Sequence, residues 1–111
     1  MPDRPSYEVI IIGAGPAGLT AGLYVSRARL NCLLVERGLF GGQIANAERI
    51  ENYPGFPEGI DGLELGQLML AQATRYGLKT VTAEATGIEF QGGQRVVKTT
   101  EGDFEAGAVI I

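Results

Sequence analysis

Three glycines spaced G-x-G-x-x-G, at Gly13, Gly15 and Gly18, follow directly on the apolar run of residues 9–12. An uninterrupted apolar run that ends in glycine predicts a short buried strand, here over residues 7–12. Pro16 suits the first position of a helix, because the N–H that proline lacks would be unpaired there in any case. The segment therefore predicts a strand, a tight turn and a helix in immediate succession.

A second strand is predicted at residues 32–36 (CLLVE), after a helix over residues 17–28. A strand–helix–strand unit of this length predicts a right-handed crossover and a parallel sheet. Glu36 ends the second strand, 18 residues after Gly18. A carboxylate at that place is typical of a group that accepts hydrogen bonds from a ribose diol, and it disfavours a 2′-phosphate.

Each glycine of the turn has a separate predicted purpose. Gly13 allows the tight turn, Gly15 lets a pyrophosphate approach the backbone, and Gly18 lets the helix pack closely on the strand. The pyrophosphate is then expected at the helix N-terminus, where free N–H groups and the helix dipole favour an anion. The motif predicts a dinucleotide site and leaves open whether the dinucleotide is NAD or FAD.

Residues 37–59 show no periodicity and are rich in Gly, Pro and Asn. A loop of this length inside a small domain is usually functional. Asp61 and Glu64 then predict a capping box that opens a helix running to about Tyr76. The apolar stripe of this helix is predicted to face the core and comprises Leu65, Leu68, Met69 and Tyr76.

The remaining chain reads as strands. Residues 78–83 predict a third strand, residues 85–90, 95–100 and 103–106 an antiparallel meander, and residues 108–111 a further buried strand. We therefore expect an α/β fold of Rossmann-like, three-layer type, with a parallel sheet plus a small antiparallel β-meander, over residues 1–111 as one domain.

Composition excludes several classes of function. The chain has a net charge of −4, no histidine and a single cysteine. A mildly acidic chain without a Lys/Arg cluster argues against nucleic acid and anionic membranes as partners. Cys32 lies in an apolar run and is expected to be buried, so neither a catalytic residue nor a metal site is predicted. The polar N-terminus does not resemble a signal peptide, no apolar run approaches a membrane span, and the cytoplasm is the expected location.

Two segments together indicate a family. GAGPAGLTAGLY and GGQIANAERIENYPGFPEGIDGLEL resemble the FAD-binding domain of low-molecular-weight thioredoxin reductases, and the likeness covers essentially the whole chain. The second segment is the more specific one, because G-G-Q followed by E-N-Y-P-G-F is not a general Rossmann feature. The resemblance implies that the glycine turn holds the ADP half of FAD.

The resemblance also implies roles for individual residues. The pyrophosphate is expected on the turn, the adenosine ribose on Glu36, the ribityl chain and flavin beside the second glycine pair and Asn52, and the adenine near the backbone of Glu84 and Ala85. The implied cofactor-binding residues are Gly13, Gly15, Pro16, Ala17, Glu36, Gly41, Gly42, Gln43, Asn52 and Ala85.

A complete member of that family carries more than this chain. The resemblance implies a parent that passes hydride from NADPH to FAD, then electrons to a C-x-x-C pair and on to thioredoxin or a similar dithiol protein. It also implies a homodimer. The NADPH domain and the C-terminal FAD segment are not in the printed sequence, so we expect an N-terminal portion that is inactive alone.

Two other interpretations stay open at this stage. The chain could be the FAD domain of a relative that lacks the cysteine pair, such as a ferredoxin–NADP reductase of the same fold. It could also be a non-catalytic module that binds a dinucleotide. Sequence beyond Ile111 would distinguish a relative without the cysteine pair from a thioredoxin reductase. A flavin absorption band would argue against a flavin-free module.

Overall fold

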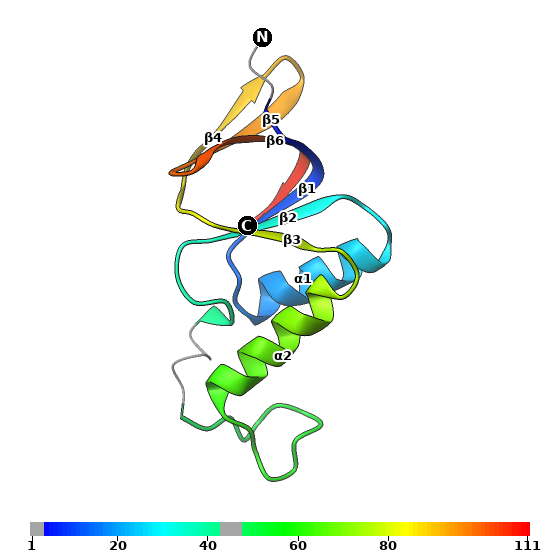
Figure 1. The fold of residues 1–111 in the computed structure, drawn as a ribbon, viewed down its shortest axis with the longest axis vertical. Helices are drawn as coiled ribbons and strands as arrows, with labels where there is room; N and C mark the ends of the chain where they lie inside the picture. The colour runs from blue at the N-terminus through cyan, green and yellow to red at the C-terminus, as the bar shows by residue number, and fades with distance from the viewer. Residues whose placement is uncertain (1–3, 43–47) are drawn as a thin grey trace.

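Six strands form one sheet in the computed structural model, which describes residues 4–42 and 48–111. The strand order is β3-β2-β1-β6-β5-β4. Both helices lie on one side of the parallel strands, and the hairpin of β4 and β5 lies toward the other side (Figure 1). The elements are β1 Ser6–Ile12, α1 Pro16–Arg27, β2 Cys32–Glu36, α2 Gly62–Thr74, β3 Lys79–Thr82, β4 Ala85–Gln91, β5 Gln94–Thr99 and β6 Gly102–Ile110.

The strands β1, β2, β3 and β6 form the parallel part of the sheet. Val9 pairs with Cys32 and Leu33 pairs with Lys79, while β6 runs parallel to β1 on its other edge. Parallel strands need a crossover connection, and α1 supplies it between β1 and β2. The carboxyl ends of β1, β2 and β3 therefore meet at one edge of the sheet, where open α/β sheets bind ligands.

The core has two parts, one on each face of the sheet. Alternate residues of β1 point to opposite faces: Ile11 packs with Leu19 and Leu34 under the helices, whereas Ile10 packs with Val97 and Ala106. This explains why the predicted buried strands read as continuous apolar runs. The predicted α/β class, with its parallel sheet and antiparallel meander, is confirmed.

One predicted boundary is wrong. The third strand of the meander and the last buried strand, predicted at residues 103–106 and 108–111, are a single strand, β6. Its first half pairs antiparallel with β5, and its second half pairs parallel with β1. The two predicted strands were divided at Gly107. Gly107 instead lets β6 pass close to β1, since a Cβ there would lie 3.1 Å from the Glu8 carbonyl oxygen.

The helix α2 begins after Asp61 as predicted, but no capping box forms. Asp61 is the N-cap residue without a side-chain hydrogen bond to the helix, and both it and Glu64 stay exposed. The predicted stripe holds only in part. Leu65 is buried and Met69 packs on the core, whereas the side chains of Leu68 and Tyr76 are exposed.

Tyr76 is exposed because it lies beyond the end of α2. Its ring lies near two guanidinium groups, those of Arg27 and Arg75, at 5.5 and 5.9 Å from the ring centroid. Within the described residues, neither helix is long and apolar enough to cross a membrane.

Candidate dinucleotide site

The glycine turn connects β1 to α1 and is held by the neighbouring strand. The Gly13 N–H donates to the Val35 carbonyl at 2.8 Å, and Gly13 has a φ of 104°, which favours glycine. A Cβ on Gly18 would lie 1.9 Å from the Gly13 carbonyl oxygen. The predicted purposes of Gly13 and Gly18, a tight turn and close helix packing, are therefore both confirmed.

Gly15 differs from Gly18 because it faces open space. No atom lies within 4 Å of a Cβ built on Gly15. Gly15 is the N-cap residue of α1, no side chain caps this helix, and its first turn carries no acidic residue. Pro16 has no N–H, so the N–H groups of Ala17 and Gly18 are the free donors of the first turn. An uncapped helix N-terminus beside open space suits an anion such as a pyrophosphate.

A shallow hollow of about 280 Å³ lies against this helix end. Its lining combines the turn with the C-terminal end of β6, and comprises Ile11, Ile12, Gly13, Gly15, Pro16, Ala17, Gly18, Ile110 and Ile111. The structure thus brings together the four residues predicted to line a pyrophosphate. Ile110 and Ile111 were predicted only as part of a buried strand over residues 108–111 and not as residues beside the turn.

Glu36 connects the turn to the next loop. Its Oε1 accepts a hydrogen bond from the Ala14 N–H and its Oε2 accepts one from the Gly38 N–H, each at 2.8 Å. A carboxylate has about four lone-pair sites, so each oxygen can accept a further hydrogen bond. The carboxylate is therefore held in place beside the turn and keeps the capacity to bind two hydroxyl groups.

A second hollow, which we call the strand-end hollow, has a volume of about 240 Å³. It lies where β1, β2 and β3 end, and is lined by Ile12, Gly13, Val35, Glu36, Arg37, Ala83, Glu84 and Ala85. Its apolar side chains and the Glu36 carboxylate suit an adenosine, which has an apolar ring and a polar sugar. The lining also carries the charged side chains of Arg37 and Glu84. Ala85, predicted to lie near an adenine, is part of this lining.

The backbone N–H and carbonyl of Glu84 already have hydrogen-bond partners within the chain. Its N–H donates to the Thr100 Oγ1 at 3.0 Å, and its carbonyl accepts from the Thr100 N–H at 3.0 Å. Arg37 was not predicted as a site residue. Its position directly after Glu36, at the end of a parallel strand, is the signal that could have identified it.

The second glycine pair folds over the first turn. Gly41 and Gly42 have φ values of 112° and 63°. The Gly41 N–H donates to the Ala14 carbonyl at 2.7 Å, and a Cβ on Gly42 would lie 2.9 Å from the Gly15 Cα. The two glycine segments therefore pack on each other, with Gly42 against Gly15. The role of the pair beside the ribityl chain and flavin stays a prediction.

Asn52 is a predicted site residue that the structure does not bring to the turn. Gln43 lies outside the described residues. Asn52 lines a separate hollow formed by the segment of residues 51–57, which shares no residue with the two hollows at the strand ends. The flavin-side roles of Gln43 and Asn52 remain predictions.

Cys32 is buried in β2 with 1% of its surface exposed, as predicted. Burial raises the pKa of its thiol to about 11. A thiol with so high a pKa is protonated at neutral pH and is a poor nucleophile.

Comparison with known proteins agrees with this geometry. Residues 7–111 match the family model of pyridine nucleotide-disulphide oxidoreductases. The chain is 46% identical over its full length to the thioredoxin reductase of Bacillus subtilis (strain 168), of which it covers 35%. It is 44% identical over 95% of its length to a bifunctional thioredoxin reductase/thioredoxin of Mycobacterium leprae, of which it covers 23%.

Solved structures show the same fold. The thioredoxin reductase of Lactococcus lactis superposes with a TM-score of 0.87 at 41% identity, over 93% of this chain and 34% of that one. The thioredoxin reductase of Streptococcus pyogenes gives 0.89 at 36% identity, over 96% and 35%. The chain thus spans about a third of the length of the thioredoxin reductases and 23% of the bifunctional relative. By its turn, its sheet and its match over residues 7–111, the chain belongs to the pyridine nucleotide-disulphide oxidoreductase family.

Proposed function

We propose that this chain binds the ADP half of FAD, as the FAD-binding portion of a thioredoxin reductase-like flavoprotein. One observation carries the proposal: the Glu36 carboxylate lies between an uncapped helix N-terminus and the strand-end hollow. An ADP group needs an anion site, a diol acceptor and an apolar recess in that order, and the three features adjoin one another here.

Each part of the ADP group has a proposed partner. The pyrophosphate binds the free N–H groups at the start of α1 beside Gly15, the ribose hydroxyls bind Glu36, and the adenine occupies the strand-end hollow. When bound, the flavin supplies the hydride and electron chemistry. The protein holds the ADP half in place, so the residues described here bind and orient and do not react.

Gly41, Gly42, Gln43 and Asn52 are proposed to lie along the ribityl chain and flavin. Support comes from the resemblance and, for the glycine pair, from its contact with Gly15. We propose NADPH as the hydride donor and thioredoxin as the final acceptor of the whole protein, because the named relatives are thioredoxin reductases. The homodimer that the resemblance implies is likewise a proposal.

The proposal is tested by titrating the 111-residue chain with FAD and with ADP-ribose, which carries the same ADP half. Isothermal titration calorimetry is expected to show that both bind, and that Glu36→Ala weakens both. Glu89→Ala is the matched control, since Glu89 is an exposed glutamate on β4 that lies 3.9 Å from Lys98. Equal binding by wild type and Glu36→Ala, with both folded, would contradict the proposed ribose contact.

A further inference from the structure

We propose that Glu84 is a specificity-determining residue of the strand-end hollow, where it restrains Arg37 and so keeps 2′-phosphorylated dinucleotides out. This inference rests on the proposed function, because it presumes that an adenosine ribose lies beside Glu36. It adds a second acidic residue, from the end of another strand, to the selection between a ribose diol and a 2′-phosphate.

Three charged side chains line the strand-end hollow: Glu36, Arg37 and Glu84. Arg37 is the one cation in this lining among the residues that the structure describes. Its Nη1 lies 3.6 Å from Glu84 Oε2. The two carboxylate oxygens of Glu36 instead accept backbone N–H groups. Arg37 therefore pairs with the carboxylate at the end of β3 rather than with its neighbour in sequence.

An arginine close to the ribose is the usual means by which a Rossmann site accepts a 2′-phosphate. Its planar guanidinium matches a phosphate with two parallel hydrogen bonds. Arg37 has the right chemistry and the right place for that task, so this site would gain affinity for a 2′-phosphate unless the arginine is otherwise engaged. Glu84 engages it and adds a second negative charge to the lining.

The backbone of Glu84 is anchored on both sides. Its N–H and carbonyl are bonded to the Thr100 side chain and backbone at 3.0 Å each. The carboxylate therefore extends from a fixed point at the rim of the hollow. A 2′-phosphate entering there has to displace the Arg37–Glu84 pair and approach two carboxylates, whereas a diol needs no cation.

The ion pair is too exposed for a stabilising role to explain it. The side chains of Arg37 and Glu84 are 75% and 55% exposed, and such pairs contribute little to folding stability. Charges at the rim of a site act on which ligand binds. Rejection of 2′-phosphates is useful in a family defined by pyridine nucleotides, because NADPH would otherwise compete with FAD for this turn.

The test compares two ligands that differ only in one group, ADP-ribose and 2′-phospho-ADP-ribose. Each is titrated by calorimetry into the 111-residue chain at low ionic strength. Wild type is expected to prefer ADP-ribose, and Glu84→Gln to reduce that preference by about 3- to 10-fold because Arg37 is released. The change is expected to shrink as salt is added, since the groups are exposed.

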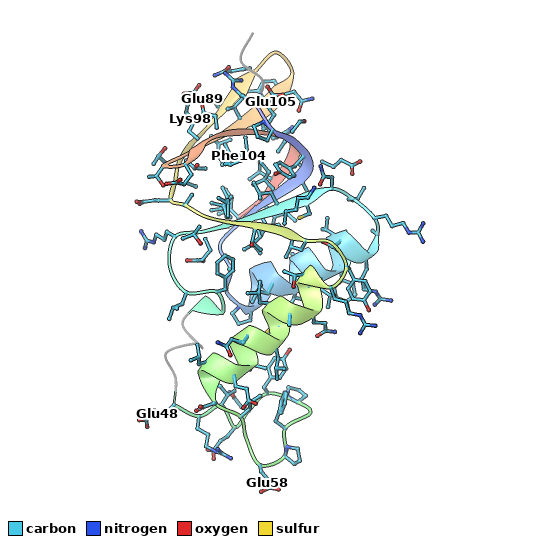
Figure 2. All side chains as sticks on the ribbon, in the orientation of Figure 1. Glu48, Glu58, Glu89, Lys98, Phe104 and Glu105 are labelled. Carbon is cyan, nitrogen blue, oxygen red and sulfur yellow. The ribbon has the colours of Figure 1, made fainter. Side chains whose placement is uncertain are left out.

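Two further variants make the result specific. Glu89→Gln removes an exposed glutamate from the ion pair with Lys98, which lies on the meander (Figure 2); it changes net charge equally and should leave the preference unchanged. Adding Arg37→Ala to Glu84→Gln should restore the wild-type preference.

The outcomes separate the two proposals. Wild type that fails to bind ADP-ribose overturns the proposed function, and this inference with it. Wild type that binds ADP-ribose, with the same preference in Glu84→Gln, overturns only the role of Glu84. An equal shift in Glu89→Gln, or a shift that survives Arg37→Ala, also overturns it, because the effect is then one of net charge.

Discussion

The glycine turn of residues 13–18 and the loop of residues 48–60 are both irregular, but they are built differently. The turn is held to the neighbouring strand by the hydrogen bond from the Gly13 N–H to the Val35 carbonyl, and its two ends pack together where Gly18 meets Gly13. The loop is closed on itself by a pair of bonds between Ile50 and Ile60, at 2.7 and 2.8 Å. The turn is thus held by a strand that is distant from it in sequence, whereas the bonds that close the loop lie within the loop.

The loop and the meander lie at opposite ends of the molecule (Figure 2). Glu48 and Glu58 mark the loop at one end, and Phe104 and Glu105 lie on the side of the meander (Figure 2). The turn lies between them, at the centre of the sheet edge. Tyr53 of the loop lines a hollow of about 220 Å³ together with residues of α1 and α2. Changes in the loop should therefore reach the turn only weakly.

The largest effect is expected from Gly18→Ala. A Cβ at 1.9 Å from a backbone oxygen forces α1 away from β1, and we expect a loss of at least about 3 kcal/mol in the free energy of unfolding. Urea denaturation followed by circular dichroism measures it. Gly87→Ala is the control, since nothing lies within 4 Å of its Cβ. Equal stability of the two variants would mean that the turn is no more constrained than an exposed strand.

Gly15→Val should separate folding from binding. The space around the Gly15 Cβ is open, so the chain should fold with a near-native circular dichroism spectrum. The branched side chain then occupies the place proposed for the pyrophosphate and should abolish detectable binding of ADP-ribose. Normal binding by this variant would show that the turn has only a structural purpose.

Glu36→Ala should affect both properties, each moderately. Loss of a charged acceptor for the ribose should weaken ADP-ribose binding by about 10- to 100-fold. Loss of the acceptor for the Ala14 and Gly38 N–H groups should lower stability by about 1 kcal/mol. Glu36→Gln keeps one acceptor oxygen, so its affinity and its stability should lie between those of wild type and Glu36→Ala. Calorimetry and urea denaturation on the same samples give both numbers.

The smallest effect concerns Cys32. Because burial raises its pKa from 9.0 to about 11, the unfolded state loses the thiol proton first as pH rises. This group's contribution to stability is therefore complete below pH 9 and declines between about pH 9 and 11.

At neutral pH the reaction of the buried Cys32 thiol with an aromatic disulfide reports opening of the sheet. Gly18→Ala should speed that reaction, and Gly59→Ala in the loop should not. Equal acceleration by both variants would show that the loop and the turn open together.

The turn was predictable because its constraints are local. The run of residues 9–12, the glycine spacing and Pro16 each specify backbone geometry within a few residues. The position of Glu36 at the end of β2 does the same for its own strand. The strand-end hollow was predictable only in outline, since Arg37 and Glu84 meet through the order of the strands. That order depends on pairing between segments far apart in sequence.

Other features could not be read locally. The continuity of β6 depends on Glu8 lying opposite Gly107, which no pattern near residue 107 reveals. The capping box at Asp61 had the right residue types, yet both side chains stay in solvent, where water satisfies them as well. Leu68 and Tyr76 fitted a helical stripe, but the burial of α2 follows Leu65 and Met69.

The pairing of β6 with β1 also constrains the order in which the chain can assemble during synthesis. Ser6 pairs with Glu105 and Ile11 pairs with Ile110, so one edge of β1 stays open until nearly one hundred further residues have left the ribosome. Closing so long a loop is slow compared with forming α1 or α2. The nascent chain thus carries an unpaired Val-Ile-Ile-Ile edge, the kind of edge to which other strands add. We therefore expect chaperones to bind this segment in the nascent chain until β6 pairs with it.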